Sequence, residues 1–490
     1  MKILLVSSEV VPFAKTGGLA DVAGALPIQL AELGHEVAVA MPKYSSIDDD
    51  TYALLPILGD IHVRLGTAGT HTAQIKKTSF PGTKVPVYFI QNAEFFDREG
   101  LYQQEDADYP DNAVRFAFFS KAVIWLLKGL DWMPDIIHCN DWQTAIIPIC
   151  MRTQPDMKYD EDLSRIRLLF TVHNLAYQGL FDHTEAARIG LGEHLFHPGA
   201  LEFYGKLNLM KGALLFSDAI TTVSRQYARE IQTPDFGCGL HGVLLFLHNR
   251  LHGILNGIDY GVWNPETDNL IPHHYSPEDF SGKVRCKADL QKVCGLDREA
   301  ETPLIGIISR LDRQKGCDLI VETAQEIADH GAQIVLLGTG VSEYHSALKR
   351  IAQGRKGRIS VNLKFDNNLA HLIEAGSDMF LMPSRYEPCG LNQLYSLKYG
   401  TVPVVRRVGG LADSIIDATS DSVKSGSATG FVFTDYSADA MMSAIERACA
   451  MFKNKSAWRK LMTNGMSRDY SWKTSALEYE RLYMEIAGMR

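Results

Sequence analysis

Short apolar runs alternate with longer stretches of helical periodicity along most of the chain. The run at residues 2–8 precedes a helical pattern over 19–33, and a second apolar run follows at 36–41. This alternation is typical of βαβ units, in which crossover helices join parallel strands. Further strands are expected in this half at 70–80 and 85–91, which suggest an inserted hairpin and strand, and at 135–138, 166–172, 219–223 and 253–255.

A second series of the same kind follows a polar segment at residues 264–301, which contains several prolines and is the best candidate for a linker. Two helical stretches end the chain, at about 456–464 and 472–488. The expected strands of this series are 304–309, 333–337, 359–362, 378–383, 402–405 and 430–433.

The pattern therefore predicts an α/β protein with two doubly wound, Rossmann-like domains that face an interdomain cleft. The expected amino-terminal domain covers residues 1–263. The expected carboxy-terminal domain covers 302–471, with 264–301 as the linker region.

Composition narrows the class of protein. The 490 residues include 49 Lys and Arg against 58 Asp and Glu, so the formal net charge is −9, which disfavours a general binder of nucleic acid or anionic membranes. No window reaches the roughly 18 apolar residues of a membrane span. The apolar run at the amino terminus is too short for the hydrophobic region of a secretory signal. Eight cysteines without a C-x-x-C pair predict reduced thiols in a cytoplasmic protein, with no metal site.

A glycine pair follows the first apolar run at the expected start of a helix. Lys15, Gly17 and Gly18 combine a cation with backbone N–H groups that can approach an anion, and the helix amino terminus adds partial positive charge. The sequence is neither G-x-G-x-x-G nor a Walker A motif, which disfavours dinucleotide and P-loop sites. A flexible turn without a ligand is the alternative interpretation.

Polar residues follow two further strands of this half. His173 comes directly after the run at 166–172, and Asp141 comes shortly after the run at 135–138. Taken singly, His173 also fits a structural histidine of the core, and Asp141 also fits an N-cap of the helix that starts near Trp142.

The second half repeats this placement. Arg310 and Lys315 lie five residues apart in one loop and can converge on a diphosphate, although a solvated charge run is the alternative. Glu387 follows a later strand, where an acid is also common as an ordinary helix-entry residue. The pair Gly409-Gly410 is a second glycine turn suited to a phosphate. Together these strand ends indicate one anionic, diphosphate-linked ligand held without a metal.

These motifs closely resemble the bacterial glycogen (starch) synthase family, from the first strand to the final helices. That family consists of retaining glucosyltransferases with the GT-B fold. The resemblance implies transfer of glucose from ADP-glucose to the non-reducing 4-hydroxyl of an α-1,4-glucan such as glycogen, with no cofactor. The segments that carry it are 15–22, 171–179, 255–259, 310–316 and 384–391.

The resemblance also implies roles for particular residues. Arg310 and Lys315 would neutralise the departing ADP, and Glu387 would bond the sugar hydroxyls. His173 would support the cation-like carbon through its ring or carbonyl, and Asp141 would contact donor or acceptor. The helix from residue 472 to 490 would return to the amino-terminal domain. Residues expected at the donor are Lys15, Gly17, Gly18, Gly390, Leu391, Gly409 and Gly410, and those expected at the acceptor or glucosyl group are Glu9, Asp21 and Asn256.

Several points stay open at the level of sequence. The contacts that choose between ADP-glucose and UDP-glucose cannot be placed, although the short amino terminus fits the ADP-glucose group. Retention of configuration fits either a Glu387 nucleophile or front-face attack by the acceptor, which the resemblance favours. The rival functions are a related glycosyltransferase with another acceptor, a phosphorylase, and a non-catalytic glucan-binding protein. The chain lacks the length of a phosphorylase, and Lys15, Arg310, Lys315 and Glu387 disfavour the last.

Overall fold

The computed structural model describes residues 1–105, 107–130 and 132–489, and the chain folds into two compact units. Unit 1 comprises Met1–Val223, Ala228–Ile254 and Trp472–Arg490, and unit 2 comprises Ser224–Tyr227 and Leu255–Ser471. The division therefore falls after Ile254 and not at the expected residue 263. The last helix belongs to unit 1 although the chain passes through unit 2 first.

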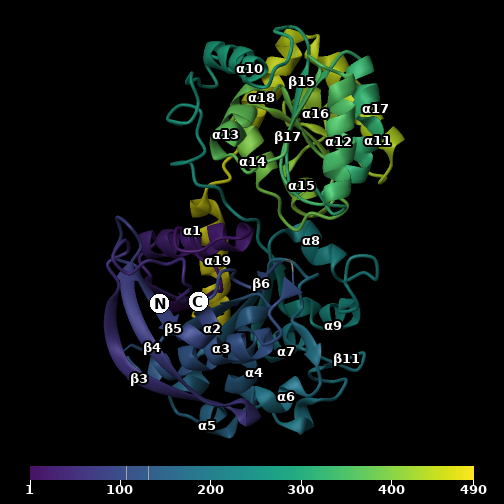
Figure 1. Ribbon diagram of the computed structural model, residues 1–490. Coiled ribbons are helices and arrows are strands. Elements are labelled where there is room, and N and C mark those ends of the chain that lie inside the picture. The colour runs from purple at the N-terminus through teal and green to yellow at the C-terminus, as the bar shows by residue number, and fades with distance from the viewer. Residues whose placement is uncertain (106, 131, 490) are drawn as a thin grey trace. The chain divides into compact units, whose positions relative to one another are not determined.

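Unit 1 is built on a nine-stranded sheet with the order β14-β13-β9-β8-β1-β2-β5-β4-β3. Its strands are parallel except at β4 and β3, which form an antiparallel hairpin beside β5. Figure 1 shows the long strands β3 and β4 side by side at one edge of this unit. Strands β1, β8 and β9 are almost wholly buried, as expected for parallel strands covered on both faces. The strand bounds are β1 (Lys2–Val6), β2 (Glu36–Pro42), β3 (Leu55–Leu65), β4 (Gly69–Ser79), β5 (Pro86–Gln91), β8 (Ile136–Asn140), β9 (Arg167–Val172), β13 (Ala219–Thr222) and β14 (Leu251–Gly253).

Helices cover the sheet of unit 1, and the remaining short strands of this unit form small separate sheets. The helices are α1 (Gly18–Glu32), α2 (Ala93–Phe96), α3 (Asn112–Gly129), α4 (Ile146–Thr153), α5 (Pro155–Lys158), α6 (Glu185–Arg188), α7 (Leu209–Phe216), α9 (His241–Phe246) and α19 (Trp472–Ala487), with α8 (Arg225–Glu230) at the division. The 3-10 helices are η1 (Gly66–Ala68), η2 (Trp142–Thr144), η3 (Leu163–Arg165), η4 (Glu193–Leu195) and η5 (His248–Arg250). The small strands are β6 (Gln103–Gln104), β7 (Ala107–Asp108), β10 (Leu180–Asp182), β11 (Glu202–Phe203) and β12 (Lys206–Asn208).

Two expectations for the strands of unit 1 were wrong in detail. Strand β3 was not predicted, because it is mostly solvent-exposed and its polar residues interrupt any apolar run. Strand β14 lies at Leu251–Gly253 and not at 253–255, because it is a short, half-buried edge strand that pairs with β13 alone.

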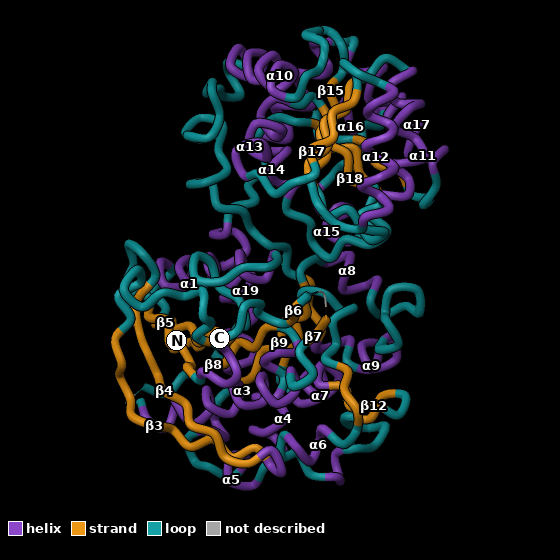
Figure 2. The backbone as a smooth tube through the Cα atoms, in the orientation of Figure 1, coloured by secondary structure: helices purple, strands orange, loops and turns teal. Residues whose placement is uncertain are grey.

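Unit 2 has a six-stranded parallel sheet with the order β17-β16-β15-β18-β19-β20. Figure 2 shows its strands β15, β17 and β18 in orange among the helices of this unit. Its strands are β15 (Leu304–Ile308), β16 (Gln333–Leu337), β17 (Ile359–Asn362), β18 (Met379–Met382), β19 (Val402–Arg406) and β20 (Phe431–Phe433). Its helices are α10 (Ser281–Val293), α11 (Cys317–Asp329), α12 (Ser342–Gly354), α13 (Asn367–Gly376), α14 (Asn392–Lys398), α15 (Gly409–Ser414), α16 (Ser420–Ser425), α17 (Ala438–Phe452) and α18 (Lys455–Met466).

The segment 264–301, expected as a linker, contains α10, which packs against α13 within unit 2. The polarity of this segment suggested exposed chain, but two of its lysines are buried and hydrogen-bonded within unit 2. Lys283 donates to two backbone carbonyls and to Thr401, and Lys287 forms a 2.7 Å ion pair with Asp378. The lysines therefore stabilise the packing of α10 instead of marking exposed chain.

Candidate functional site

In unit 1, the Glu9 carboxylate lies just beyond the carboxyl end of β1 and holds the loop that leads into α1. It accepts hydrogen bonds from the Thr16 hydroxyl at 2.6 Å, the Gly17 N–H at 3.1 Å and the Tyr102 hydroxyl at 2.6 Å. The Thr16 N–H also donates to it. Glu9 is only 4% exposed, so these four donors satisfy a buried carboxylate and fix the glycine loop.

This arrangement changes the interpretation of the first glycine turn. The Gly17 N–H donates to the Glu9 carboxylate and is therefore already engaged by an anionic side chain, and α1 begins at Gly18. Lys15 is half-exposed and pairs with Asp21 at 2.7 Å. Burial raises the pKa of Asp21, and the neighbouring Lys15 opposes that shift.

Asp141 and His173 lie beyond the carboxyl ends of the adjacent strands β8 and β9. The His173 N–H donates to Asp141 Oδ1 at 2.8 Å. Asp141 has φ 56° and ψ 176°, a backbone conformation that residues other than glycine rarely adopt. Asp141 occupies the N-cap position of the 3-10 turn at Trp142, as in the alternative interpretation, but its side chain makes no capping hydrogen bond to that turn. Burial raises the pKa of Asp141 to about 7.

The His173 ring is buried and uncharged. Burial lowers its pKa to about 3, and its Nε2 lies 2.8 Å from Asn140 Oδ1. A buried, hydrogen-bonded ring agrees with the alternative interpretation of His173 as a structural histidine. However, His173 lies at a strand end beside Asp141, and ligands of parallel sheets bind at such ends.

In unit 2, Lys315 and Glu387 form an ion pair at 2.6 Å. Lys315 lies in the loop between β15 and α11, just before the N-cap residue Gly316, and Glu387 lies in the loop between β18 and α14. The Ser384 hydroxyl donates to the same carboxylate oxygen, Glu387 Oε2, at 2.9 Å. Glu387 is 5% exposed, so the carboxylate is held in one position by a cation and a hydroxyl.

Arg310 contacts its own loop. Its guanidinium donates to Gln314 at 3.2 Å and lies 3.6 Å from the Asp312 carboxylate, with 58% of the side chain exposed. The structure therefore pairs Lys315 with Glu387, while Arg310 is a largely exposed cation in the loop after the same strand, β15.

The second glycine pair packs tightly against the Glu387 loop. A Cβ on Gly409, whose φ is +42°, would lie 1.9 Å from the Glu387 carbonyl oxygen, and one on Gly410 would lie 2.0 Å from that of Cys389. The Gly410 N–H donates to the carbonyls of Glu387 and Pro388. The pair therefore supports the loop that carries Glu387, and the Gly410 N–H does not face a phosphate.

The remaining predicted residues of unit 2 surround this loop. Gly390 has φ +70°, and Leu391 is the N-cap residue of α14. Asn256 is 5% exposed, and its Oδ1 has no hydrogen-bond partner among the residues that the structure describes. Burial raises the pKa of Cys389 to about 12, so its thiol stays protonated and reacts slowly with thiol reagents.

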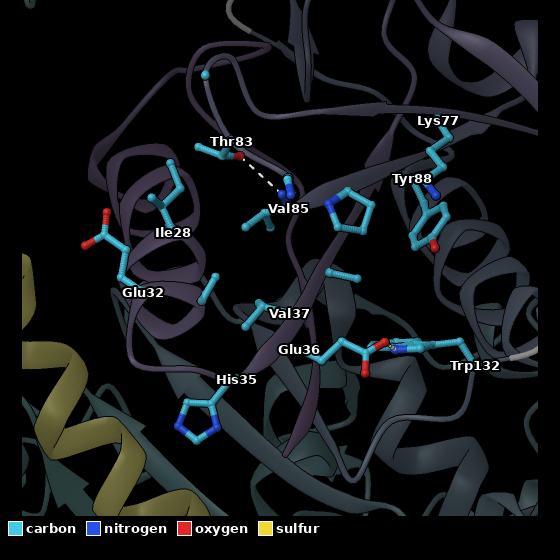
Figure 3. Close-up of a pocket in the computed structure, with 15 residues that line it drawn as sticks. Ile28, Glu32, His35, Glu36, Val37, Lys77, Thr83, Val85, Tyr88 and Trp132 are labelled. Atoms are coloured by element: carbon cyan, nitrogen blue, oxygen red, sulfur yellow. Dashed lines mark hydrogen bonds between the residues drawn. The ribbon is translucent and has the colours of Figure 1, made fainter.

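A cavity of about 690 Å³ lies elsewhere in unit 1, between α1, β2 and the β4–β5 hairpin (Figure 3). It opens at the amino-terminal ends of β2 and β5, with Ile28 and Glu32 on one side and Tyr88 and Trp132 on the other. None of the predicted site residues lines this cavity, so it is separate from the residues at the carboxyl ends of β1, β8 and β9. Within residues 1–105, 107–130 and 132–489, no group of three or more His, Cys, Asp or Glu side chains is arranged to hold a metal, and no helix is long and apolar enough to cross a membrane.

Sequence reasoning missed three residues that hold the predicted ones. Tyr102 and Ser384 donate to Glu9 and Glu387, and Asn140 contacts His173. Ser384 lies inside the noted segment 384–391 and Asn140 directly precedes Asp141, so strand-end position was a usable signal. Tyr102 lies in a loop 93 residues from Glu9, and nothing in the local pattern connects the two.

Comparison with known proteins assigns the family. A model of the starch synthase catalytic domain matches residues 2–245, and a model of glycosyl transferases group 1 matches residues 295–461. A glycogen synthase of Geotalea uraniireducens is 48% identical, with 99% of this chain and 98% of that protein covered. The chain belongs to the glycogen synthase family. Glycogen synthase 2 of Geobacter sulfurreducens is 47% identical over the full length of both chains.

Solved structures agree with this family assignment. The catalytic domain of starch synthase IV from Arabidopsis thaliana, solved with ADP and acarbose bound, matches with a TM-score of 0.90 and 35% identity over 99% of each chain. Sucrose-phosphate synthase from Thermosynechococcus elongatus matches with a TM-score of 0.60 at 17% identity, which shows a common fold. The predicted GT-B architecture of this glycogen synthase family member is thus confirmed, and the chain is a glycosyltransferase.

Proposed function

We propose that the chain transfers glucose from ADP-glucose to the non-reducing 4-hydroxyl of an α-1,4-glucan, with retention of configuration and release of ADP. The observation that carries this proposal is the buried Glu387 carboxylate paired with Lys315 at a strand end, in a chain that belongs to the glycogen synthase family. The relative bound to ADP and acarbose supports the choice of donor nucleotide and of an oligosaccharide acceptor.

The first task of the site is to stabilise the leaving diphosphate. Arg310 and Lys315 supply two cations at the carboxyl end of β15, where the negative charge on ADP grows as the sugar–phosphate bond breaks. Loss of one such pre-placed donor typically slows a reaction about 10²–10³-fold. Lys15 adds a further cation beside α1 for donor binding.

Glu387 has the second task, which is to orient the glucosyl group. Its Oε2 accepts hydrogen bonds from Lys315 and Ser384, so Oε1 is the oxygen that accepts hydrogen bonds from the sugar hydroxyls. Gly390, Leu391, Gly409 and Gly410 keep the Glu387 loop close to the donor. The role of the second glycine pair is thus support of the loop.

In unit 1, His173 supports the cation-like carbon and Asp141 contacts donor or acceptor. Glu9 acts on substrate through the loop that it holds, because its oxygens already accept four protein hydrogen bonds. Asp21 and Asn256 remain the proposed contacts of the acceptor or glucosyl group, and Asn256 Oδ1 is a buried acceptor without a protein partner.

The bond changes follow front-face displacement. The acceptor 4-hydroxyl forms the new bond to the anomeric carbon on the face that the phosphate leaves, and its proton passes to the leaving phosphate oxygen. Trapping a covalent glucosyl–Glu387 species would contradict this route and assign Glu387 as a nucleophile. The eight cysteines, all free, support a reducing, cytoplasmic location.

The proposed function is tested by proton NMR of the purified protein with ADP-glucose and maltoheptaose. We expect new α-1,4 anomeric signals and stoichiometric ADP, with no signal of a β-glucosidic linkage at any time. β-Linked product would exclude retention. Donor hydrolysis without chain extension would point to another acceptor. The absence of any reaction from a folded protein would favour a non-catalytic glucan binder.

A further inference from the structure

The Asn140 side chain, at the carboxyl end of β8, is completely buried and makes three hydrogen bonds. Its Nδ2 donates to the Val6 carbonyl at 3.1 Å and to the His138 carbonyl at 3.3 Å, and its Oδ1 lies 2.8 Å from His173 Nε2. Backbone carbonyls only accept, so the amide nitrogen must face them. The amide oxygen is therefore forced to face His173.

An oxygen at this position accepts only from a protonated nitrogen. We propose that Asn140 is a positioning residue that holds His173 as the tautomer with its proton on Nε2. Nδ1 then carries the lone pair and is the acceptor of the ring. The catalytic relevance of this inference rests on the proposed function, because the role of His173 in glucosyl transfer is itself proposed.

The backbone of His173 is held from the same side. Asn140 is aligned with Thr171 between β8 and β9, and the next residue, Asp141, accepts the His173 N–H. Two consecutive residues thus fix both the ring and the main chain. The ionisable groups around this pair are Asp141, His138 and Glu9. Asn140 itself does not titrate, so the contact to Nε2 does not change with pH.

The test is nitrogen-15 NMR of the full-length protein labelled at histidine, with the His173 signals assigned by their loss in His173→Gln. We expect Nε2 to be protonated and Nδ1 unprotonated at pH 7. In Asn140→Leu the constraint is removed, so both nitrogens should shift towards intermediate positions. Its kcat should fall about 10- to 100-fold, as for other residues that orient an imidazole, with KM for ADP-glucose nearly unchanged.

Asn140→Asp keeps an oxygen acceptor for Nε2 and, with its buried carboxyl protonated, an O–H donor for one of the two carbonyls, so it should retain the wild-type tautomer, with more activity than Asn140→Leu. Asn208→Leu, which removes another buried amide of unit 1, should leave the His173 signals unchanged. A wild-type proton on Nδ1 would overturn the inference, as would unchanged His173 signals in Asn140→Leu. These outcomes do not depend on turnover. A protein with the expected tautomer and no glucosyl transfer would contradict the proposed function alone, and if Asn140→Leu does not fold, the wild-type spectrum still decides.

Discussion

At the scale of the residue, burial determines the charge of the strand-end groups. It keeps the His173 ring neutral, with its pKa at about 3, and raises the pKa of Asp141 to about 7. Both shifts follow from the cost of holding a charge away from water. The same burial keeps the Cys389 thiol protonated, so the cysteine beside Glu387 acts as a packed side chain.

Asp141→Asn should make stability less dependent on pH. Because the folded protein holds the Asp141 proton more tightly than the unfolded chain, this group stabilises the fold below pH 4, and the contribution is lost as the pH rises through about 7. We expect the wild-type free energy of unfolding to fall relative to the variant by about 1.4 kcal/mol per pH unit over that window. Urea titrations at pH 5 and pH 7 measure the difference, and parallel pH dependences would contradict it.

Ser384→Ala removes the hydroxyl that donates to Glu387 Oε2. A hydrogen bond to a charged group contributes about 1.5–3 kcal/mol, so we expect kcat to fall about 10- to 100-fold. Initial rates with ADP-glucose measure this effect. Ser425→Ala, on the exposed helix α16, is the matched control and should have wild-type kinetics. Equal kcat for the two variants would show that Ser384 does not position Glu387.

At the scale of the element, loop packing explains the glycines better than anion binding does. The loop of Glu387 rests directly on the start of α15, and the first glycine loop rests on Glu9. Each of these loops is therefore held by contacts within its own unit, which is the kind of preorganisation that the proposed electrostatic catalysis requires.

Gly410→Ala should disturb this packing. The added Cβ would lie 2.0 Å from the Cys389 carbonyl oxygen, so the Glu387 loop must move. We expect a loss of about 1–3 kcal/mol of stability and a lower kcat. Thermal unfolding and initial rates check both effects. Gly354→Ala, where a Cβ meets nothing within 4 Å and φ is not left-handed, is the matched control, and an equally small effect of both changes on kcat would contradict the packing role.

Most strands were predictable, because buried parallel strands such as β9 are continuous apolar runs. The exposed strand β3 and the lysine-containing helix α10 were not, since their burial depends on partners distant in sequence. The candidate site follows the same division. Position after a strand made Glu387 and His173 candidates, whereas the bond from Tyr102 to Glu9 arises only when the chain is folded.

At the scale of the whole molecule, the last helix completes unit 1. The Tyr483 hydroxyl lies 2.8 Å from His138 Nδ1 in the buried strand β8, and Glu480 lies 2.8 Å from His35 at the end of α1. Residues 472–489 thus tie the end of the chain to the sheet that carries Asn140 and Asp141, so the integrity of the unit 1 site depends on a segment that follows unit 2 in sequence.

Tyr483→Phe tests this dependence. It leaves His138 Nδ1 without its partner in a fully buried position, which should lower the free energy of unfolding by about 1–3 kcal/mol. Calorimetry measures the change. Met484→Ala, at an exposed position of the same helix, should have little effect. Equal stability of Tyr483→Phe and wild type would show that α19 contributes nothing through this bond.

The most direct test of the central claim is incorporation of radiolabelled glucose into glycogen, with ADP-glucose and UDP-glucose supplied separately. The claim is that this chain is an ADP-glucose-dependent glucosyltransferase whose Glu387 is essential. We predict rapid incorporation from ADP-glucose, much less from UDP-glucose, and none from ADP-glucose with a folded Glu387→Ala variant. Preference for UDP-glucose, or full activity of Glu387→Ala, would contradict the account.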